Sequence, residues 1–100
     1  MQTTAAPLAG TETEVFAEET TETRLDDPWR VILYDDDIHT FEEVILQLMK
    51  AVGCSPEQGY QHALTVHTRG KDCVFEGEFE ECFRVQGVLR EIQLVTEIEG

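Results

Sequence analysis

The stretch that decides the fold is WRVILYDDDIHTFEEVILQLMKAVG, residues 29–53. It begins with the run Trp29–Tyr34, whose β-branched and aromatic side chains predict a strand. Three consecutive carboxylates, Asp35–Asp37, which we call the acidic corner, follow that strand directly. Like charges in sequence repel one another, and a simple turn could be made with one Asp and a Gly. We therefore expect a positively charged group to bind at the acidic corner.

The sequence carries a start signal and a stop signal for the helix that follows the acidic corner. Thr40 and Glu43 have the spacing of a capping box, which predicts a helix that starts at about Phe41. Gly53 is expected to end it. Apolar side chains recur between these ends with the period of an amphipathic helix: Phe41, Val44, Ile45, Leu48, Met49 and Val52.

The remaining elements follow in the order helix, strand, helix, strand. Residues 55–58, Ser-Pro-Glu-Gln, predict a second capped helix that runs to about His67. A short strand is expected over residues 72–75, a third helix from Gly77 and Glu78 to Leu89, and a last strand over residues 92–98. The order β-α-α-β-α-β predicts the α+β class, with a small three-stranded antiparallel sheet and three helices packed on one face.

Residues 1–27 differ from the rest in composition. They are rich in Thr and Glu and have few large apolar side chains, so burial cannot offset the entropy lost on ordering. We expect a disordered acidic arm, residues 1–27, before a single domain, residues 28–100. The arm could be a solubilising tail or a segment that a partner engages.

The charge balance excludes several classes of partner. The formal net charge is −14 and the chain holds only seven Lys and Arg residues, so binding to nucleic acid or to an anionic membrane is not expected. No apolar stretch is long enough for a membrane span, and the amino terminus lacks the features of a secretion signal. We expect a cytoplasmic protein.

The cysteines point to the same compartment. Cys54, Cys73 and Cys82 are odd in number and form no Cys-x-x-Cys pair, which argues against a disulfide framework and a zinc site. They are expected to be buried thiols in a reducing cytosol. No cofactor is expected.

Other functions of the acidic corner remain open. It could be a solvated turn, and it lacks the loop glycine and ligand spacing of an EF-hand. A metal-binding or hydrolytic domain that uses Asp35–Asp37 with His39 or His67 is one alternative, although His62 and His67 do not share a helix face. A plain interaction domain is another. No nucleophile, base and orienting group can be assembled, so the chain is not expected to be an enzyme.

Two motifs resemble the ClpS family. Val31-Ile32-Leu33 before the acidic corner is followed by Val66-His67 and Gly70-Lys71 at a spacing that is similar to ClpS adaptors, which hand N-degron substrates to a Clp ATPase. The resemblance covers residues 29–98. It implies an adaptor, expected to be a monomer, for proteins with Leu, Phe, Tyr or Trp at the amino terminus, delivered to the N-terminal domain of a Clp AAA+ ATPase.

The resemblance also implies the site residues. The substrate amine would contact Asp35, Asp36 and His67, since carboxylates accept charge-assisted hydrogen bonds from an ammonium group. A hydrophobic pocket beside them would be lined by Ile38, His39, Phe41, Val44, Ala63, Val66 and Leu94. An ATPase interface is implied at the start of the third helix, at Glu80, Glu81 and Arg84.

Three positions depart from the ClpS pattern. Asp35 stands where the family usually has Asn, and a carboxylate cannot donate to a substrate carbonyl as an amide can. Phe41 and Ala63 each replace a common Met. The stiff ring of Phe41 would narrow the mouth of the pocket, and the small side chain of Ala63 would deepen its floor. We therefore expect a preference for peptides that begin with an aromatic residue.

Overall fold

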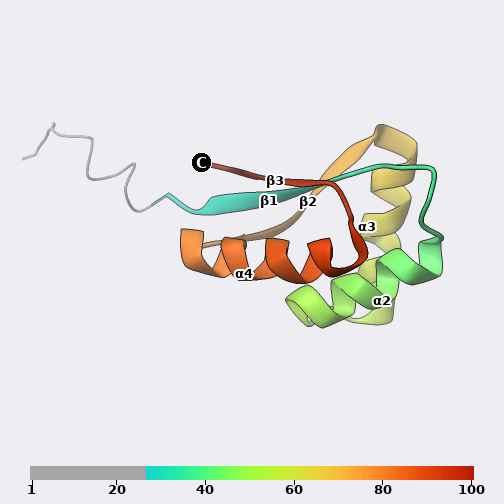
Figure 1. The fold of residues 1–100 in the computed structure, drawn as a ribbon, viewed down its shortest axis with the longest axis horizontal. Helices are drawn as coiled ribbons and strands as arrows, with labels where there is room; N and C mark the ends of the chain where they lie inside the picture. The colour runs from blue at the N-terminus through green and yellow to red at the C-terminus, as the bar shows by residue number, and fades with distance from the viewer. Residues whose placement is uncertain (1–26) are drawn as a thin grey trace, which may run out of the picture.

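The sheet is built around its first strand. In the computed structural model of the chain, β1 (Trp29–Tyr34) lies between two antiparallel partners, β2 (Lys71–Gly77) and β3 (Thr96–Glu99), as Figure 1 shows. The structure describes residues 27–100. The predicted arm, residues 1–27, lies outside this part of the chain apart from its last residue.

The central position of β1 follows from its side chains. Val31 pairs with Phe75 on one side and with Ile98 on the other, and Val31 and Leu33 are completely buried. The pairing register between β1 and β2 shifts between Val31 and Ile32. Ile32 is also buried. An apolar strand of this kind is stable only with neighbours on both edges and a covered face.

The first two helices begin and end as their sequence signals predict. α2 (Phe41–Val52) starts at Thr40, and both hydrogen bonds of the capping box with Glu43 are present. α3 (Pro56–Arg69) starts at Ser55 with the equivalent box to Gln58. Both helices end at a glycine with positive φ, 70° at Gly53 and 92° at Gly70, a conformation that glycine adopts without strain.

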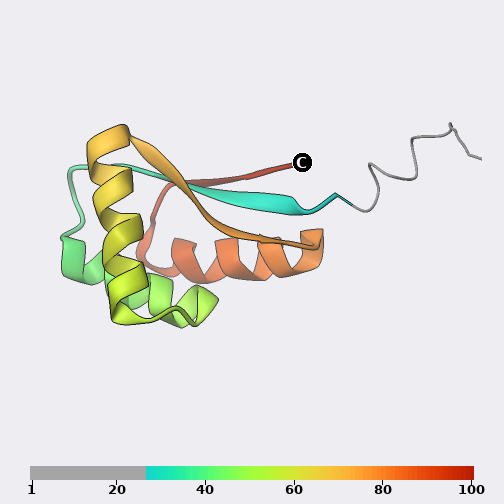
Figure 2. The same cartoon turned by 180° about the vertical axis from the view of Figure 1, so that it is seen from behind.

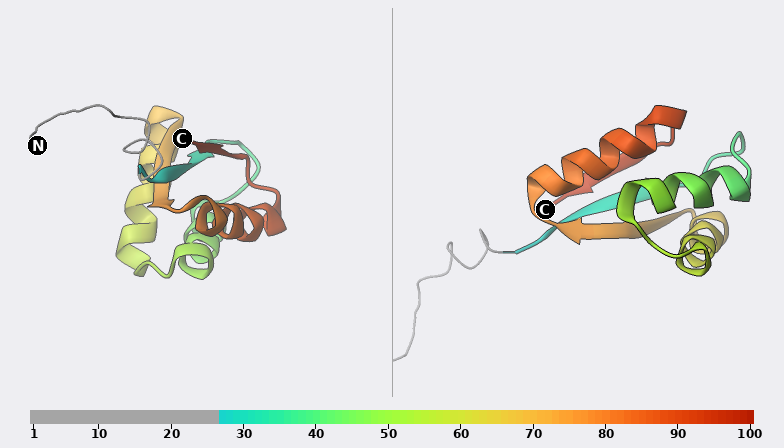
Figure 3. Two further views of the ribbon diagram at one scale, coloured as in Figure 1. Left: turned by 90° about the vertical axis from the view of Figure 1, so that its left-hand side faces the viewer. Right: turned by 90° about the horizontal axis from the view of Figure 1, so that it is seen from below.

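The helices pack around one side and one end of the sheet. α4 (Phe79–Leu89) lies along one face and contacts all three strands, and α2 packs against α4 (Figures 1 and 3). α3 stands at the end of the sheet where β1 finishes, as Figure 2 shows from behind. α2 and α3 approach closely at Gly59, where a Cβ atom would lie 3.1 Å from Cγ2 of Ile45. This arrangement brings the start of α2 and the end of α3 to the same corner of the molecule.

The core lies between the sheet, α2 and α4. Its completely buried side chains are Val31, Leu33, Leu48, Cys82, Val85 and Leu89. Cys82 is buried, whereas Cys54 and Cys73 are only half-buried, and desolvation raises the pKa of all three thiols. These thiols are therefore protonated near neutral pH.

The start of the last strand differs from the prediction. Residues 90–92 form a single 3-10 turn, η2 (Arg90–Ile92), and β3 begins at Thr96 rather than at Ile92. Gln93 takes a left-handed conformation with φ 67°, and the Leu94 amide donates to the carbonyl of Leu89. The chain therefore turns back toward β1 through residues 90–95 before strand pairing starts. This turn places Leu94 beside Ala63 and Val66 of α3.

Candidate functional site

A cavity lies at the corner where β1, α2 and α3 meet. The chain leaves β1 at Tyr34, bends through residues 35–40 and enters α2, while the end of α3 stands opposite. The amide of Asp35 donates to the carbonyl of Gly70 at 2.9 Å, which ties this bend to the turn after α3. The cavity between these segments has a volume of about 220 Å³.

The cavity wall contains the predicted binding residues with one exception. Ile38 points outward with 81% of its surface exposed and does not line the cavity. Four further residues line it that the sequence reasoning did not assign to the pocket: Leu33, Tyr34, Asp37 and Thr40. The complete wall comprises Leu33, Tyr34, Asp35, Asp36, Asp37, His39, Thr40, Phe41, Val44, Ala63, Val66, His67 and Leu94.

All three residues of the acidic corner line the cavity. An extended chain would send Asp36 to the opposite side from its neighbours, because side chains alternate along a strand. The strand ends at Tyr34, however, and the chain bends over the next residues, so the alternation stops there. The position of Leu33 and Tyr34 at the end of β1, directly before the acidic corner, is the signal that could have identified them.

Asp36 is held within its own loop. One carboxylate oxygen accepts from the backbone amides of Ile38 and His39, both at 2.9 Å, and the other contacts Nδ1 of His39 at 2.9 Å. Burial opposes ionisation of Asp36, but the two amide bonds and the His39 ring outweigh it and lower its pKa. Asp36 is therefore ionised and already well bonded.

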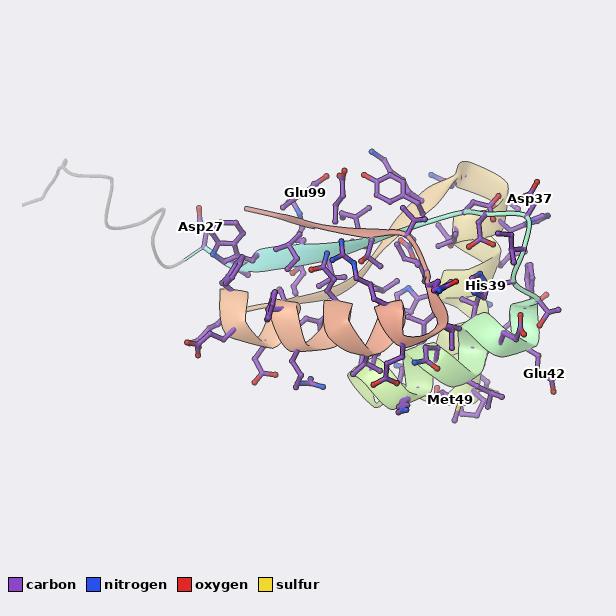
Figure 4. All side chains as sticks on the ribbon, viewed as in Figure 1. Asp27, Asp37, His39, Glu42, Met49 and Glu99 are labelled. Atoms are coloured by element: carbon purple, nitrogen blue, oxygen red, sulfur yellow. The ribbon has the colours of Figure 1, made fainter. Side chains whose placement is uncertain are left out.

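His39 connects this loop to η2. Its Nε2 lies 2.5 Å from the carbonyl oxygen of Ile92, while Nδ1 contacts Asp36. The hydrogen bond to Asp36 is the largest influence on the ring and raises its pKa against the opposing effect of burial. In Figure 4 the His39 side chain lies inside the molecule at this corner, whereas Asp37 projects from the outer side of the loop.

Asp35 and His67 are farther apart than Asp36 and His39. Oδ1 of Asp35 and Nδ1 of His67 are 3.9 Å apart, and both side chains are partly exposed at the cavity mouth. The His67 ring packs edge-on against Phe41, with ring centroids 5.5 Å apart. Asp35 thus presents a carboxylate oxygen with room for another donor.

The opposite side of the cavity is apolar. Ala63, Val66 and Leu94 are almost completely buried, and Phe41 and Val44 are half-buried beside them. Ala63 and Val66 lie one turn apart on the face of α3 that meets α2. A ligand with a cationic group next to an apolar group could therefore satisfy both sides of this cavity.

The residues implied for an ATPase interface lie on α4, away from the cavity. Arg84 contacts Glu81 at 3.3 Å and donates to the carbonyl of Ala51 at 3.1 Å, whereas Glu80 is simply exposed. Exposed aromatic rings flank them, since Phe79 and Phe83 lie on the same helix. This surface is charged, partly apolar and accessible.

The part of the chain that the structure describes holds neither a candidate metal cluster nor a candidate membrane-spanning helix. Within residues 27–100, no group of three or more His, Cys, Asp or Glu side chains is arranged to hold a metal ion. None of the helices in that range is long and apolar enough to cross a membrane.

Known proteins resemble the chain in sequence and fold. A family model described as ATP-dependent Clp protease adaptor protein ClpS matches residues 24–93. The ATP-dependent Clp protease adapter protein ClpS of Corynebacterium jeikeium (strain K411) is 30% identical over 93 residues, which cover 93% of this chain and 87% of that protein. ClpS2 of Agrobacterium tumefaciens, solved bound to L-phenylalaninamide, has a TM-score of 0.66 at 21% identity and covers 73% of this chain and 98% of that one.

A second group of relatives is much longer. The E3 ubiquitin-protein ligase UBR2 of Homo sapiens is 35% identical over 63 residues, which are 63% of this chain but only 4% of the ligase, and UBR2 of Mus musculus matches equally. The chain thus spans a small fraction of these ligases, whereas the family model and the bacterial adapter match most of it. The chain belongs to the ClpS family, the adaptor proteins of the ATP-dependent Clp protease.

Proposed function

We propose that this chain is an adaptor that binds proteins through a bulky hydrophobic amino-terminal residue and delivers them to a Clp-family AAA+ unfoldase. The observation that supports this most directly is the cavity, where ionised carboxylates stand beside an apolar floor. An amino-terminal Leu, Phe, Tyr or Trp joins an ammonium group to an apolar side chain on one carbon atom. The two sides of the cavity match these two groups.

The polar side of the cavity would bind the amine. An ammonium group has three donors, and each hydrogen bond between charged partners contributes about 1.5 to 3 kcal/mol. Asp35 offers an accessible carboxylate, His67 lies beside it, and Asp36 lies deeper in the loop, paired with His39. An acetylated amino terminus has lost this charge and two donors, so it would bind far more weakly.

The apolar side would bind the first side chain. Burial of a Leu or Phe side chain contributes roughly 1.5 to 3 kcal/mol. Phe41 at the rim stands 5.9 Å from the ring of Tyr60 and 5.5 Å from that of His67, which makes an aromatic cluster at the mouth. A flat aromatic ligand can stack in such a cluster, which supports the preference for Phe, Tyr and Trp over Leu.

The fold relative from Agrobacterium tumefaciens supports this choice of ligand class. That protein was solved with L-phenylalaninamide, an aromatic amino acid derivative that resembles the first residue of a peptide. Its likeness to this chain is one of fold. The ligand therefore guides the choice of peptides to test, and the residues of this cavity carry the proposal.

Peptide binding can be measured by fluorescence anisotropy with labelled peptides that begin with Phe, Leu or Gly. Each peptide is used with a free and with an acetylated amino terminus. We expect binding of the free Phe and Leu peptides, with Phe tighter, and loss of binding on acetylation. Binding that ignores acetylation would refute an amine site, and a Leu peptide that clearly outbinds Phe would refute the aromatic preference.

Delivery would use a second surface on α4. We propose that Glu80, Glu81 and Arg84 contact the N-terminal domain of the ATPase. Glu80→Lys is the sharper test, because Arg84 also bonds the carbonyl of Ala51 and its loss would disturb packing. We expect Glu80→Lys to weaken binding to the ATPase domain and to leave peptide affinity unchanged. Glu76→Lys, at an exposed residue of β2, serves as the control. Equal ATPase binding by both variants would remove Glu80 from the interface.

A further inference from the structure

We propose that His39 is a positioning residue of the cavity: as a cationic imidazolium it clamps the Asp36 carboxylate to η2 and cancels its charge, so that Asp35 carries the free negative charge for a peptide amine. The role toward a peptide depends on the function proposed above. The protonation state of His39 is a property of the free protein and can be measured without any ligand.

The first observation is that His39 lies between two acceptors. Nδ1 contacts a carboxylate oxygen of Asp36 at 2.9 Å, and Nε2 contacts the backbone carbonyl of Ile92 at 2.5 Å. A carbonyl and an ionised carboxylate cannot donate a hydrogen bond, and a neutral imidazole carries only one N–H group. A neutral ring would therefore point a lone pair at one of these oxygens. The doubly protonated ring satisfies both.

The second observation is the burial of the pair. The side chain of His39 is 10% exposed and that of Asp36 is 16% exposed, so water screens them little. The other charged group acting on the ring is Glu43 of α2, which also favours the cation. An isolated carboxylate would be costly at this depth, and the cationic ring compensates it.

The third observation is the contrast with Asp35. Three donors already occupy the oxygens of Asp36, the amides of Ile38 and His39 and the ring itself. Asp35 has only a 3.9 Å contact with His67, and its side chain is 39% exposed. Asp37 projects from the outer side of the loop. An incoming ammonium group thus meets one neutralised carboxylate, Asp36, and one available carboxylate, Asp35.

The clamp also joins two walls of the cavity. Ile92 ends η2, and Leu94, two residues later, lies in the apolar wall opposite the loop. The His39 ring is the side-chain bridge between the loop and this segment. Its cationic state therefore helps to fix the distance between the polar and the apolar side of the site.

The protonation state can be read by NMR on protein with 15N-labelled histidine and no peptide. We expect both ring nitrogens of His39 to carry protons at neutral pH, with a titration midpoint above the ordinary value of 6.5. Asp36→Asn should lower that midpoint, whereas Asp72→Asn should not. Asp72 is a matched control because it pairs with His62 at 2.6 Å and neither residue lines the cavity. A neutral His39 ring below pH 6.5 would overturn the clamp.

The division of roles can be tested by a double-mutant cycle with a labelled peptide that begins with Phe. The cycle is measured at a pH below the lowered midpoint, where the His39 ring of Asp36→Asn is still protonated. Asp36→Asn alone then leaves an unpaired cation beside the ammonium group, and we expect about a tenfold loss of affinity. Adding His39→Gln removes that cation and should restore most of the affinity. Rescue of this kind cannot arise if Asp36 contacts the amine directly, because the double variant would then bind as poorly as Asp36→Asn. If the losses of peptide-binding free energy in the two single variants simply add in the double variant, the proposed pairing is refuted.

The two measurements separate the possible failures. If the wild-type protein binds none of the peptides, the proposed function fails, and the NMR titration still decides whether the clamp exists. If peptides bind but His39 is neutral, the clamp fails alone. Asp72→Asn should leave peptide affinity unchanged, and a loss there would indicate that the loss in Asp36→Asn reflects general damage to the fold.

Discussion

At the scale of single residues, the site depends on how three carboxylates in sequence differ in environment. Asp36 is half-buried and bonded to its own loop, Asp35 stands at the cavity mouth, and Asp37 is exposed on the outer side. Identical side chains thus have different electrostatic roles. The loop geometry and the ring of His39 set these differences.

The role of Asp35 leads to a prediction about amine charge. Asp35→Asn keeps the shape of the side chain but replaces a charge-assisted bond with a neutral one, a difference of about 1 kcal/mol. We expect the ratio of affinities for free and acetylated Phe peptides to fall several-fold in anisotropy measurements. Glu42→Gln is the control, because Glu42 is exposed, does not line the cavity, and projects outward from α2 in Figure 4. An unchanged ratio in Asp35→Asn would contradict the assignment.

The pairing of Asp36 with His39 leads to a prediction about stability and pH. His39 has a raised pKa, so its contribution is complete below about pH 6.5 and is lost as the pH rises through the folded-state value. Asp36 has a lowered pKa, so its contribution is complete above about pH 3.8 and is lost as the pH falls through the folded-state value. The pair should therefore stabilise the protein most between these limits.

Urea unfolding of the wild type and Asp36→Asn can measure this window. We expect Asp36→Asn to cost about 1 to 3 kcal/mol near pH 5 and progressively less at alkaline pH. Asp37→Asn removes the same formal charge from an exposed residue without an ion pair in residues 27–100, so it corrects for net charge. A stability difference that does not depend on pH would show that the pair is not ionised as described.

At the scale of elements, the capping boxes determine where the site is built. Thr40 both caps α2 and lines the cavity, whereas Ser55 caps α3 at the opposite end of the helix from the cavity. The first turn of α2 carries Phe41 to the rim. A change in this cap should therefore affect the site as well as the helix.

Thr40→Ala and Ser55→Ala form a matched pair. Each removes one capping hydrogen bond, and each should cost about 1 kcal/mol of unfolding free energy in urea titrations. Only Thr40→Ala should also weaken peptide binding, by a few-fold, because Phe41 and His39 flank the lost cap. Equal peptide affinities in the two variants would mean that the start of α2 does not shape the site.

At the scale of the whole molecule, the cavity and the acidic segment before it have separate roles in our proposal. All cavity residues lie within residues 33–94. We expect removal of residues 1–26 to leave peptide affinity unchanged and to slow degradation of a substrate by the unfoldase and its protease, since the arm would act during delivery. A truncated protein that loses peptide binding would instead place the arm at the site.

Much of this protein could be predicted from local sequence patterns. The capping boxes at Thr40 and Ser55, the glycines at the helix ends and the apolar run at Val31–Leu33 specify the first strand and the first two helices, because each signal depends on neighbours within one turn or one strand. The order of the elements then restricts the fold to a small α+β domain. The acidic corner and Val66-His67, which the sequence singles out, lie in the wall of one cavity.

What the tertiary structure alone decided concerns contacts between distant residues. The carbonyl of Ile92 meets the ring of His39 across 53 residues, and no local pattern indicates this contact. Leu94 was implied as a pocket residue by the ClpS resemblance alone, and it reaches the cavity wall after a 3-10 turn, where alternating apolar residues predicted a strand. Ile38 turned outward for the related reason that the loop bends after Tyr34. Short-range signals depend on backbone hydrogen bonds close in sequence, whereas the charge state of His39 and the shape of the cavity depend on which acceptors the packed chain brings together.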